Sequence, residues 1–215
     1  MGVGFETTDD NNRKQVLDTH PLLSFTEIIQ SNTGNKGKLV SDPRYVYAWR
    51  PFNNEVMTLN YLKNKFVEFN GEFYNCHLIQ GFGDIYTFSE KRPTKRLNYG
   101  LEVFNSNGDL VFNSEQRPLK ILDIINIADV RQSRTNINGN TSHWRKSYSV
   151  TAAVVFIQRP LWTDGSSFVT SGVGLRDSYI SMEETVEERD AAAANRWTGN
   201  TYSLYALVID VSNFK

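Results

Sequence analysis

The sequence predicts an all-β protein, an antiparallel β-sandwich with one surface helix. Aromatic residues make up 13% of the chain, with ten Tyr and thirteen Phe, and these side chains favour the pleated, half-buried surface of a strand. Asn-Gly pairs at 70–71 and 107–108 each separate two runs rich in apolar residues. Because Asn-Gly readily adopts the positive φ angles of tight hairpin turns, both sites predict antiparallel hairpins.

Strand patterns fill the first part of the chain. In the run after Pro21, the side chains of Leu23, Phe25 and Glu27 share one face if the backbone is extended. Later runs rich in Tyr, Val and Phe repeat this character, and polar or glycine-containing segments separate them. We predict strands over 22–30, 44–49, 55–62, 66–69 and 72–79.

The clearest hairpin signal lies at 98–114. The runs 101–104 and 110–112 flank a polar tip that contains Asn107-Gly108. The lengths of the two runs and the turn residues between them are those of a short antiparallel hairpin. None of these residues indicates catalysis.

This hairpin resembles one that is common in small virion proteins of tailed bacteriophages. The matching features are Gly-Leu-Glu-Val at 100–103, the turn with its glycine, and Val-Phe-Asn-Ser at 111–114. The resemblance covers a small part of the chain. It implies a structural component of the tail or tail tip that is assembled in the host cytoplasm, binds other virion proteins and forms a homo-oligomer.

A faint internal echo predicts two consecutive β modules. Gly4-Phe5-Glu6 matches Gly100-Leu101-Glu102, and Pro21-Leu22 matches Pro118-Leu119 at nearly the same offset. A basic, proline-containing connector at 89–96 lies between the two copies, where a linker is expected. We therefore predict modules at 1–97 and 98–215. The alternative is a single sandwich over 1–215.

The second half continues with strand patterns and one helix pattern. Residues 118–130 are rich in Ile, which favours a strand over a short helix because Ile is β-branched. Alternating apolar residues at 144–157 and an apolar run at 202–211 predict further strands. At 181–195, Ser181 and Glu184 have the spacing of a capping box and a run of alanines follows. This segment predicts the surface helix.

Composition argues against several classes of partner and location. A net charge of −1 gives no electrostatic basis for binding nucleic acid. No apolar run is long enough to span a bilayer, and the N-terminal residues lack the pattern of a signal peptide. The single cysteine, Cys76, excludes an internal disulfide, and we interpret it as a buried strand residue. We expect neither a nucleic-acid partner nor a membrane span.

No pattern indicates an enzyme. His20, His77 and His143 are far apart and lack the spacing of metal ligands. The chain has no nucleophile elbow and no phosphate-binding loop. The glutamates at 183–188 are interpreted as a solvated helix face and not as the paired carboxylates of a glycosidase. We therefore assign no catalytic, cofactor-binding or metal-binding residue.

The second functional hypothesis is a glycan- or receptor-binding module at the tail tip. Trp162 lies between Pro160 and Asp164-Gly165, which predicts an exposed loop tip where the ring could stack on a sugar. Trp144 and Asn138 are further candidate contacts for a host surface glycan or a protein partner. The alternative is that the tryptophan rings are part of the buried core, which is the more frequent position of aromatic side chains in β proteins.

Overall fold

The structure is a computed structural model that describes residues 23–31, 38–40, 44–69, 72–90, 98–104, 107–137, 140–163, 167–176, 178–187 and 199–214. These residues form sixteen β-strands and one short 3-10 helix, η2 (Val130–Gln132), and no α-helix lies among them. The predicted all-β fold class is therefore confirmed. No helix in these ranges is long and apolar enough to cross a membrane.

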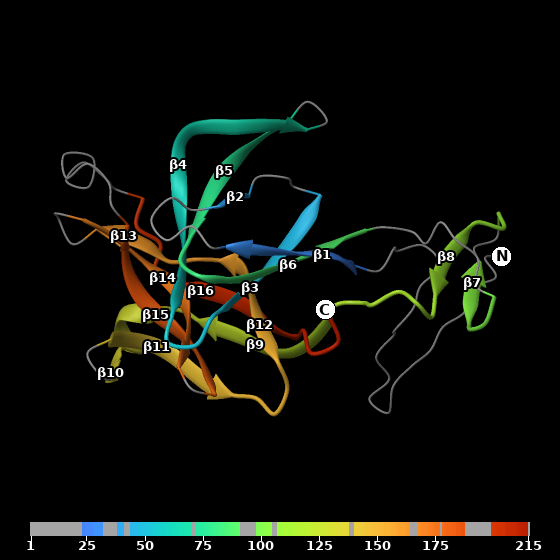
Figure 1. Cartoon of the computed structure of the whole chain (residues 1–215). Helices are drawn as coiled ribbons and strands as arrows, with labels where there is room; N and C mark the ends of the chain where they lie inside the picture. The colour runs from blue at the N-terminus through green and yellow to red at the C-terminus, as the bar shows by residue number, and fades with distance from the viewer. Residues whose placement is uncertain are drawn as a thin grey trace.

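One sheet has six antiparallel strands (Figure 1). β1 and β9 are its two edges, and the chain visits the strands between them out of sequence order. From edge to edge the strands are β1 (Ser24–Ser31), β6 (Gly83–Ser89), β3 (Tyr45–Pro51), β12 (Ala152–Gln158), β16 (Leu204–Asp210) and β9 (Lys120–Ile127).

The second sheet contains eight strands, and every pairing in it is antiparallel. Its long strands β4 and β5 form a curved ribbon that rises away from the other strands in Figure 1. Along the sheet the strands are β10 (Thr135–Ile137), β11 (Asn140–Ser147), β15 (Tyr179–Glu187), β14 (Phe168–Arg176), β4 (Val56–Phe69), β5 (Glu72–Gln80) and β2 (Lys38–Val40), and β13 (Leu161–Thr163) pairs with β14.

The two sheets pack face to face around the main core. The six-stranded sheet contributes buried side chains that include Trp49, Ile85 and Val154. The eight-stranded sheet contributes others, among them Met57 and Met182. Burial of this apolar surface is the main stabilising term for such a sandwich, and the predicted β-sandwich is confirmed.

A second apolar cluster lies on the other face of the six-stranded sheet. β12 shows the division clearly, because Val154 belongs to the main core whereas Val155 belongs to this second cluster. Phe214, near the end of the chain, covers part of the second cluster and stacks on Phe25 with ring centroids 4.6 Å apart. The central strands of this sheet are therefore buried on both faces.

Both predicted hairpins are confirmed. β7 (Glu102–Phe104) pairs with β8 (Leu110–Asn113) as a separate two-stranded sheet. Gly108 in its turn has a φ angle of +80°, which glycine adopts without strain. In the other hairpin Phe69 of β4 pairs with Glu72 of β5, and the Asn70-Gly71 turn itself lies outside the described residues.

The predicted surface helix at 181–195 is wrong over its first half. Residues 181–187 belong to β15, which pairs with β14 along nine positions and with β11 on its other side. The Ser181 hydroxyl does not cap a helix and instead donates a hydrogen bond to Glu183 Oε1 (2.7 Å). Pairing with two neighbours outweighed the weak local helix preference. Residues 188–195 lie outside the described ranges.

Strands from both predicted modules mix in each sheet. In the six-stranded sheet β3 pairs with β12, and in the eight-stranded sheet β4 pairs with β14. A boundary at residues 97/98 therefore does not separate one hydrogen-bonded sheet from the other. The first copy of the echo, at residues 4–6, lies outside the described part of the chain.

Candidate functional site

The structure places the three candidate contact residues differently from one another. Trp162 lies on β13, is 5% exposed and belongs to the main core. The prediction that it occupies an exposed loop tip is wrong, because β13 pairs with β14 and turns the ring inward. Trp144 is half-buried on β11 and packs against the same core. Asn138 lies outside the described residues.

His143 is a buried side chain near Trp162. Their ring centroids are 6.3 Å apart, and the histidine side chain is 0% exposed. Burial, together with the positive charge of Arg134, lowers the pKa of His143 to about 4. The imidazole is therefore neutral near pH 7. Among the described residues there is no group of three His, Cys, Asp or Glu that could hold a metal ion.

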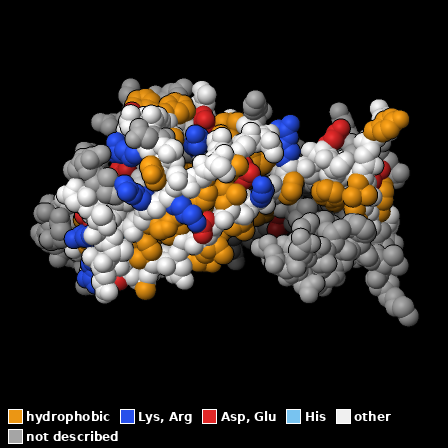
Figure 2. Space-filling view, turned by 90° about the horizontal axis from the view of Figure 1, so that it is seen from below, with side chains coloured by type: hydrophobic (Ala, Val, Ile, Leu, Met, Phe, Trp, Pro, Cys, Tyr) orange, Lys and Arg blue, Asp and Glu red, His pale blue; other side chains and the backbone are white. Residues whose placement is uncertain are grey.

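An exposed apolar surface lies along the free edge of the six-stranded sheet. Ile121 and Ile124 on the edge strand β9 are 51% and 56% exposed. Ile124 is the cross-strand neighbour of Leu207, which is in turn the neighbour of Val155, so these side chains form an apolar row. We call the exposed part of this row, with Ile121, the β9 surface. Figure 2, which views the molecule from below, shows hydrophobic side chains gathered in the middle of that face, and Figure 1 places β9 in the lower half of the molecule.

A polar cluster connects β9 to the other sheet. The carboxylate of Asp123 accepts hydrogen bonds from Lys146 Nζ (2.7 Å) and from the Tyr148 hydroxyl (2.9 Å). The bond from Lys146 is the main reason that the pKa of Asp123 lies below its usual value, while burial and the bond to Asp123 raise the pKa of Tyr148. Both interactions link the edge strand β9 to the segment that ends β11.

The hairpin β7–β8 carries further exposed apolar residues. Tyr99 and Leu101, just before β7, are 95% and 52% exposed. Ser114 closes the base of the hairpin, since its N–H donates to the Leu101 carbonyl (2.9 Å) and its hydroxyl accepts from the Leu101 N–H (3.2 Å). The following segment joins the start of β1 through Phe25 N–H to Arg117 O and Leu119 N–H to Leu23 O, both 2.9 Å.

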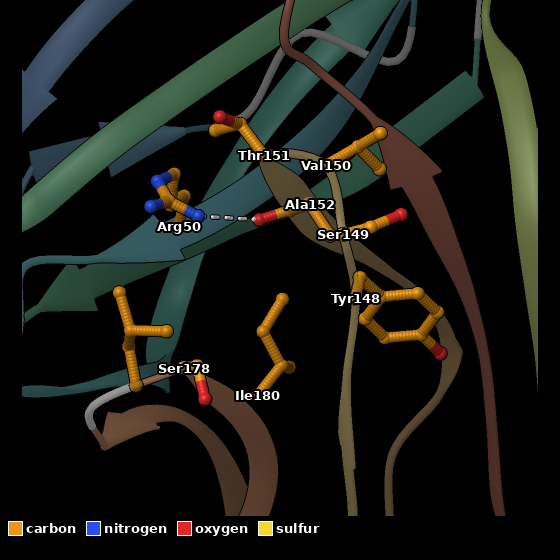
Figure 3. A pocket seen from close by; sticks show the side chains of 9 residues that line it. Arg50, Tyr148, Ser149, Val150, Thr151, Ala152, Ser178 and Ile180 are labelled. Atoms are coloured by element: carbon orange, nitrogen blue, oxygen red, sulfur yellow. Dashed lines mark hydrogen bonds between the residues drawn. The ribbon is translucent and has the colours of Figure 1, made fainter.

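A pocket of about 210 Å³ opens at one end of the sandwich (Figure 3). Its walls come from three separate segments. These are Arg50 on β3, residues 148–152 that lead from β11 into the start of β12, and the facing ends of β14 and β15 with Leu175, Ser178 and Ile180. Figure 3 shows Ser178 and Ile180 across from Arg50 and Ala152. The guanidinium is the one permanently charged group among the lining side chains.

Neither the pocket nor the β9 surface is visible as a sequence motif. Arg50 precedes a proline and belongs to no recognisable pattern, and the three pocket segments come together only through sheet pairing. The isoleucine-rich run forms the predicted strand, but its composition did not show that some of its isoleucines are exposed. The composition of a strand does not reveal whether it lies at an edge.

Comparisons with known proteins add no assignment. A scan of protein-family models, a search of curated proteins and a search of solved structures each found no match to this chain.

Proposed function

We propose that this protein is a structural component of a bacteriophage virion, associated with the tail or tail tip. In this proposal it is assembled in the host cytoplasm, binds other virion proteins and acts through protein–protein contacts in an oligomer. Two features support the proposal. They are the hairpin that resembles those of small tail proteins and the apolar surface beside an open sheet edge.

The β9 surface is the observation that carries the proposal. An edge strand presents unpaired main-chain N–H and C=O groups, which can pair with a strand of another subunit. Ile121 and Ile124, both more than half exposed, add apolar area that association would bury. β9 is ordered by its pairing with β16 and is also linked to the other sheet through Asp123, and an already ordered strand binds at a lower entropic cost.

The hairpin residues that resemble the phage proteins have a structural role here. Ser114 closes the hairpin against Leu101, and the Asn113 side chain accepts from the N–H groups of Glu115 and Gln116 (3.2 Å each). These contacts close the base of the hairpin and order the turn that follows it. The motif therefore favours an assembly role over a catalytic one.

The test combines Ile121→Thr and Ile124→Thr in one variant. Because both side chains are exposed, we expect the melting temperature to stay within a few degrees of the wild-type value. Incorporation into particles that lack the protein, and the mass of the purified oligomer in solution, should both fall. Val186→Thr is the matched control, since Val186 is 63% exposed on β15, outside the β9 surface. Wild-type incorporation of the double variant would contradict this role of β9.

A glycan- or receptor-binding module is the second candidate function. The buried Trp162 no longer supports it, but the Arg50 pocket does, because small polar ligands bind in concave sites with a few convergent polar groups. Purified protein that binds host cells or their surface polysaccharide in isolation would favour this candidate.

A further inference from the structure

We propose that the Arg50 pocket binds one carboxylate-bearing sugar unit, with the guanidinium of Arg50 pairing with the carboxylate. This inference rests on the second proposed function, glycan binding. It does not depend on the exposed isoleucines of the β9 surface, which do not line the pocket; the two regions are connected by the hydrogen bond from Tyr148 to Asp123.

The guanidinium of Arg50 has donors available for a ligand. It donates one hydrogen bond, from Nη1 to the Ala152 carbonyl oxygen (3.0 Å), and forms no ion pair with a carboxylate of the described residues. Asp84 is the cross-strand neighbour of Arg50 on β6. Burial raises the pKa of the Asp84 carboxyl, and the positive charge of Arg50 offsets part of this rise. An arginine has five N–H donors in a planar fork, and the described residues accept a hydrogen bond from one of them.

Arg176 differs from Arg50 in the number of hydrogen bonds that its guanidinium donates within the fold. Arg176 donates to both oxygens of the buried Glu183, from Nε (3.2 Å) and from Nη2 (3.1 Å), and its Nη1 donates to the Asn54 carbonyl. Its donors are therefore used within the fold. The described residues that line the Arg50 pocket include no Asp or Glu, and a two-oxygen anion is the best geometric match to the planar fork of a guanidinium.

The rest of the lining favours a sugar as the carrier of the carboxylate. Ser149, Thr151 and Ser178 supply hydroxyl groups, each of which can donate and accept hydrogen bonds with sugar hydroxyls. Tyr148 adds a ring whose hydroxyl is already bound to Asp123, so the ring is held in place. A volume of about 210 Å³ lies below the usual range for drug-sized ligands and suits a single small unit.

The experiment titrates the purified full-length protein with methyl β-D-glucuronide as the probe. Methyl β-D-glucoside, the neutral counterpart, and acetate, the carboxylate without a sugar, are titrated in parallel by calorimetry and by NMR of the backbone amides. We expect the glucuronide to bind about tenfold or more tightly than either comparison ligand. The amide shifts should concentrate at residues 148–152 and 178–180.

Variants identify the residue that reads the carboxylate. Arg50→Gln should weaken glucuronide binding by about tenfold to a hundredfold, because it removes a charge-assisted pair, whereas Arg50→Lys should retain part of the affinity. Arg145→Gln is the matched control, since it removes the same charge from an exposed position outside the pocket. Ser178→Phe fills the pocket from an exposed position without changing Arg50. It tests the site even if Arg50→Gln fails to fold by circular dichroism.

Several outcomes would overturn the inference. Equal affinity for glucoside and glucuronide would show that the carboxylate is not read, and equal affinity for acetate would show that the sugar is not. Loss of binding in Arg145→Gln, or undiminished binding in Ser178→Phe, would place the ligand elsewhere. If the glucuronide does not bind but the protein binds host cells, this inference fails and glycan or receptor binding stands. If neither binds, both fail, and particle incorporation still tests the assembly role separately.

Discussion

His143 is a buried ionisable residue in the main body of the sandwich. Its side chain lies next to Trp162, with Arg134 and Glu184 nearby, and its Nε2 atom is 4.0 Å from a Glu184 carboxylate oxygen. Burial disfavours the charged imidazolium, and the guanidinium of Arg134 disfavours it further. The neutral side chain packs in the interior near pH 7, whereas its protonation in acid destabilises the folded protein.

The sign of the pH effect follows from the two pKa values. The folded-state pKa is about 4, whereas an unperturbed histidine has a pKa of 6.5. Between these values the unfolded chain binds a proton that the folded chain does not, so the free energy of unfolding falls as pH falls from 6.5 towards 4. The full effect is about 3 kcal/mol. We expect His143→Phe to lose this contribution, and urea unfolding of both proteins between pH 7 and pH 4 measures it.

Carboxylates also titrate near pH 4, so the informative quantity is the difference between the two proteins. Wild type should lose stability relative to His143→Phe as pH falls through the window from 6.5 to 4. Parallel curves for the two proteins would show that His143 is not held neutral in the folded state.

At the scale of elements, β14 is the strand on which the eight-stranded sheet depends. All its residues from Phe168 to Leu175 are buried, and it pairs with β15, β4 and β13. Two glycines permit these close approaches. Gly174 leaves space for the carboxylate of Glu183, and Gly172 lies against the backbone of β4 at Met57.

Gly172→Ala tests this close approach. A Cβ at position 172 would lie 2.7 Å from the main-chain oxygen of Met57, which is nearer than a carbon atom and an oxygen atom can pack. The strands must therefore separate, and we expect a loss of about 1–3 kcal/mol in the free energy of unfolding. Hydrogen exchange at the amides of Met57 and Val173 should rise as well.

Gly108→Ala provides the comparison for this substitution. A Cβ at Gly108 would meet no atom within 4 Å, although its φ angle of +80° imposes a local cost. This variant should leave exchange in β4 and β14 unchanged. If Gly172→Ala has the free energy of unfolding of the wild type, β4 and β14 do not pack as closely as the approach of Gly172 to Met57 indicates.

At the scale of the whole molecule, the two halves of the chain are interleaved. The core between the sheets combines Trp49 and Met57 from the first half with Val154 and Met182 from the second. The second apolar cluster also combines the two halves, since the ring centroids of Phe88 and Phe214 lie 5.4 Å apart. Among the described residues, both apolar clusters therefore draw side chains from the two halves.

Separate expression of residues 1–97 and 98–215 tests this interdependence. We expect neither fragment to show a cooperative thermal transition, because each would expose the apolar face that the other half covers. A mixture of the two should recover part of the wild-type circular dichroism spectrum. A cooperative transition in either fragment alone would support the two-module organisation suggested by the sequence echo.

Local sequence patterns were sufficient to predict elements that depend on interactions between neighbouring residues. The hairpin at 98–114 follows from the apolar runs and the Asn-Gly turn, and the strand preference of Ile in β9 follows from β-branching. The capping signature at Ser181 failed because its stabilisation is small beside that of a strand paired on both sides. The candidate site was least predictable, since Arg50 and Ser178 are brought to one pocket by strands far apart in the chain.

The all-β class and the two Asn-Gly hairpins could be predicted from the sequence alone, which also carries the resemblance behind the proposed phage role. These depend on backbone preferences and alternating side chains, which act over a few residues. Three features became visible only in the folded protein. Trp162 is buried in the core, β9 is an edge strand with exposed isoleucines, and Arg50 lines a pocket. Burial and strand pairing depend on which distant strands become neighbours, and the order of strands in a sheet cannot be inferred from any single segment of the chain.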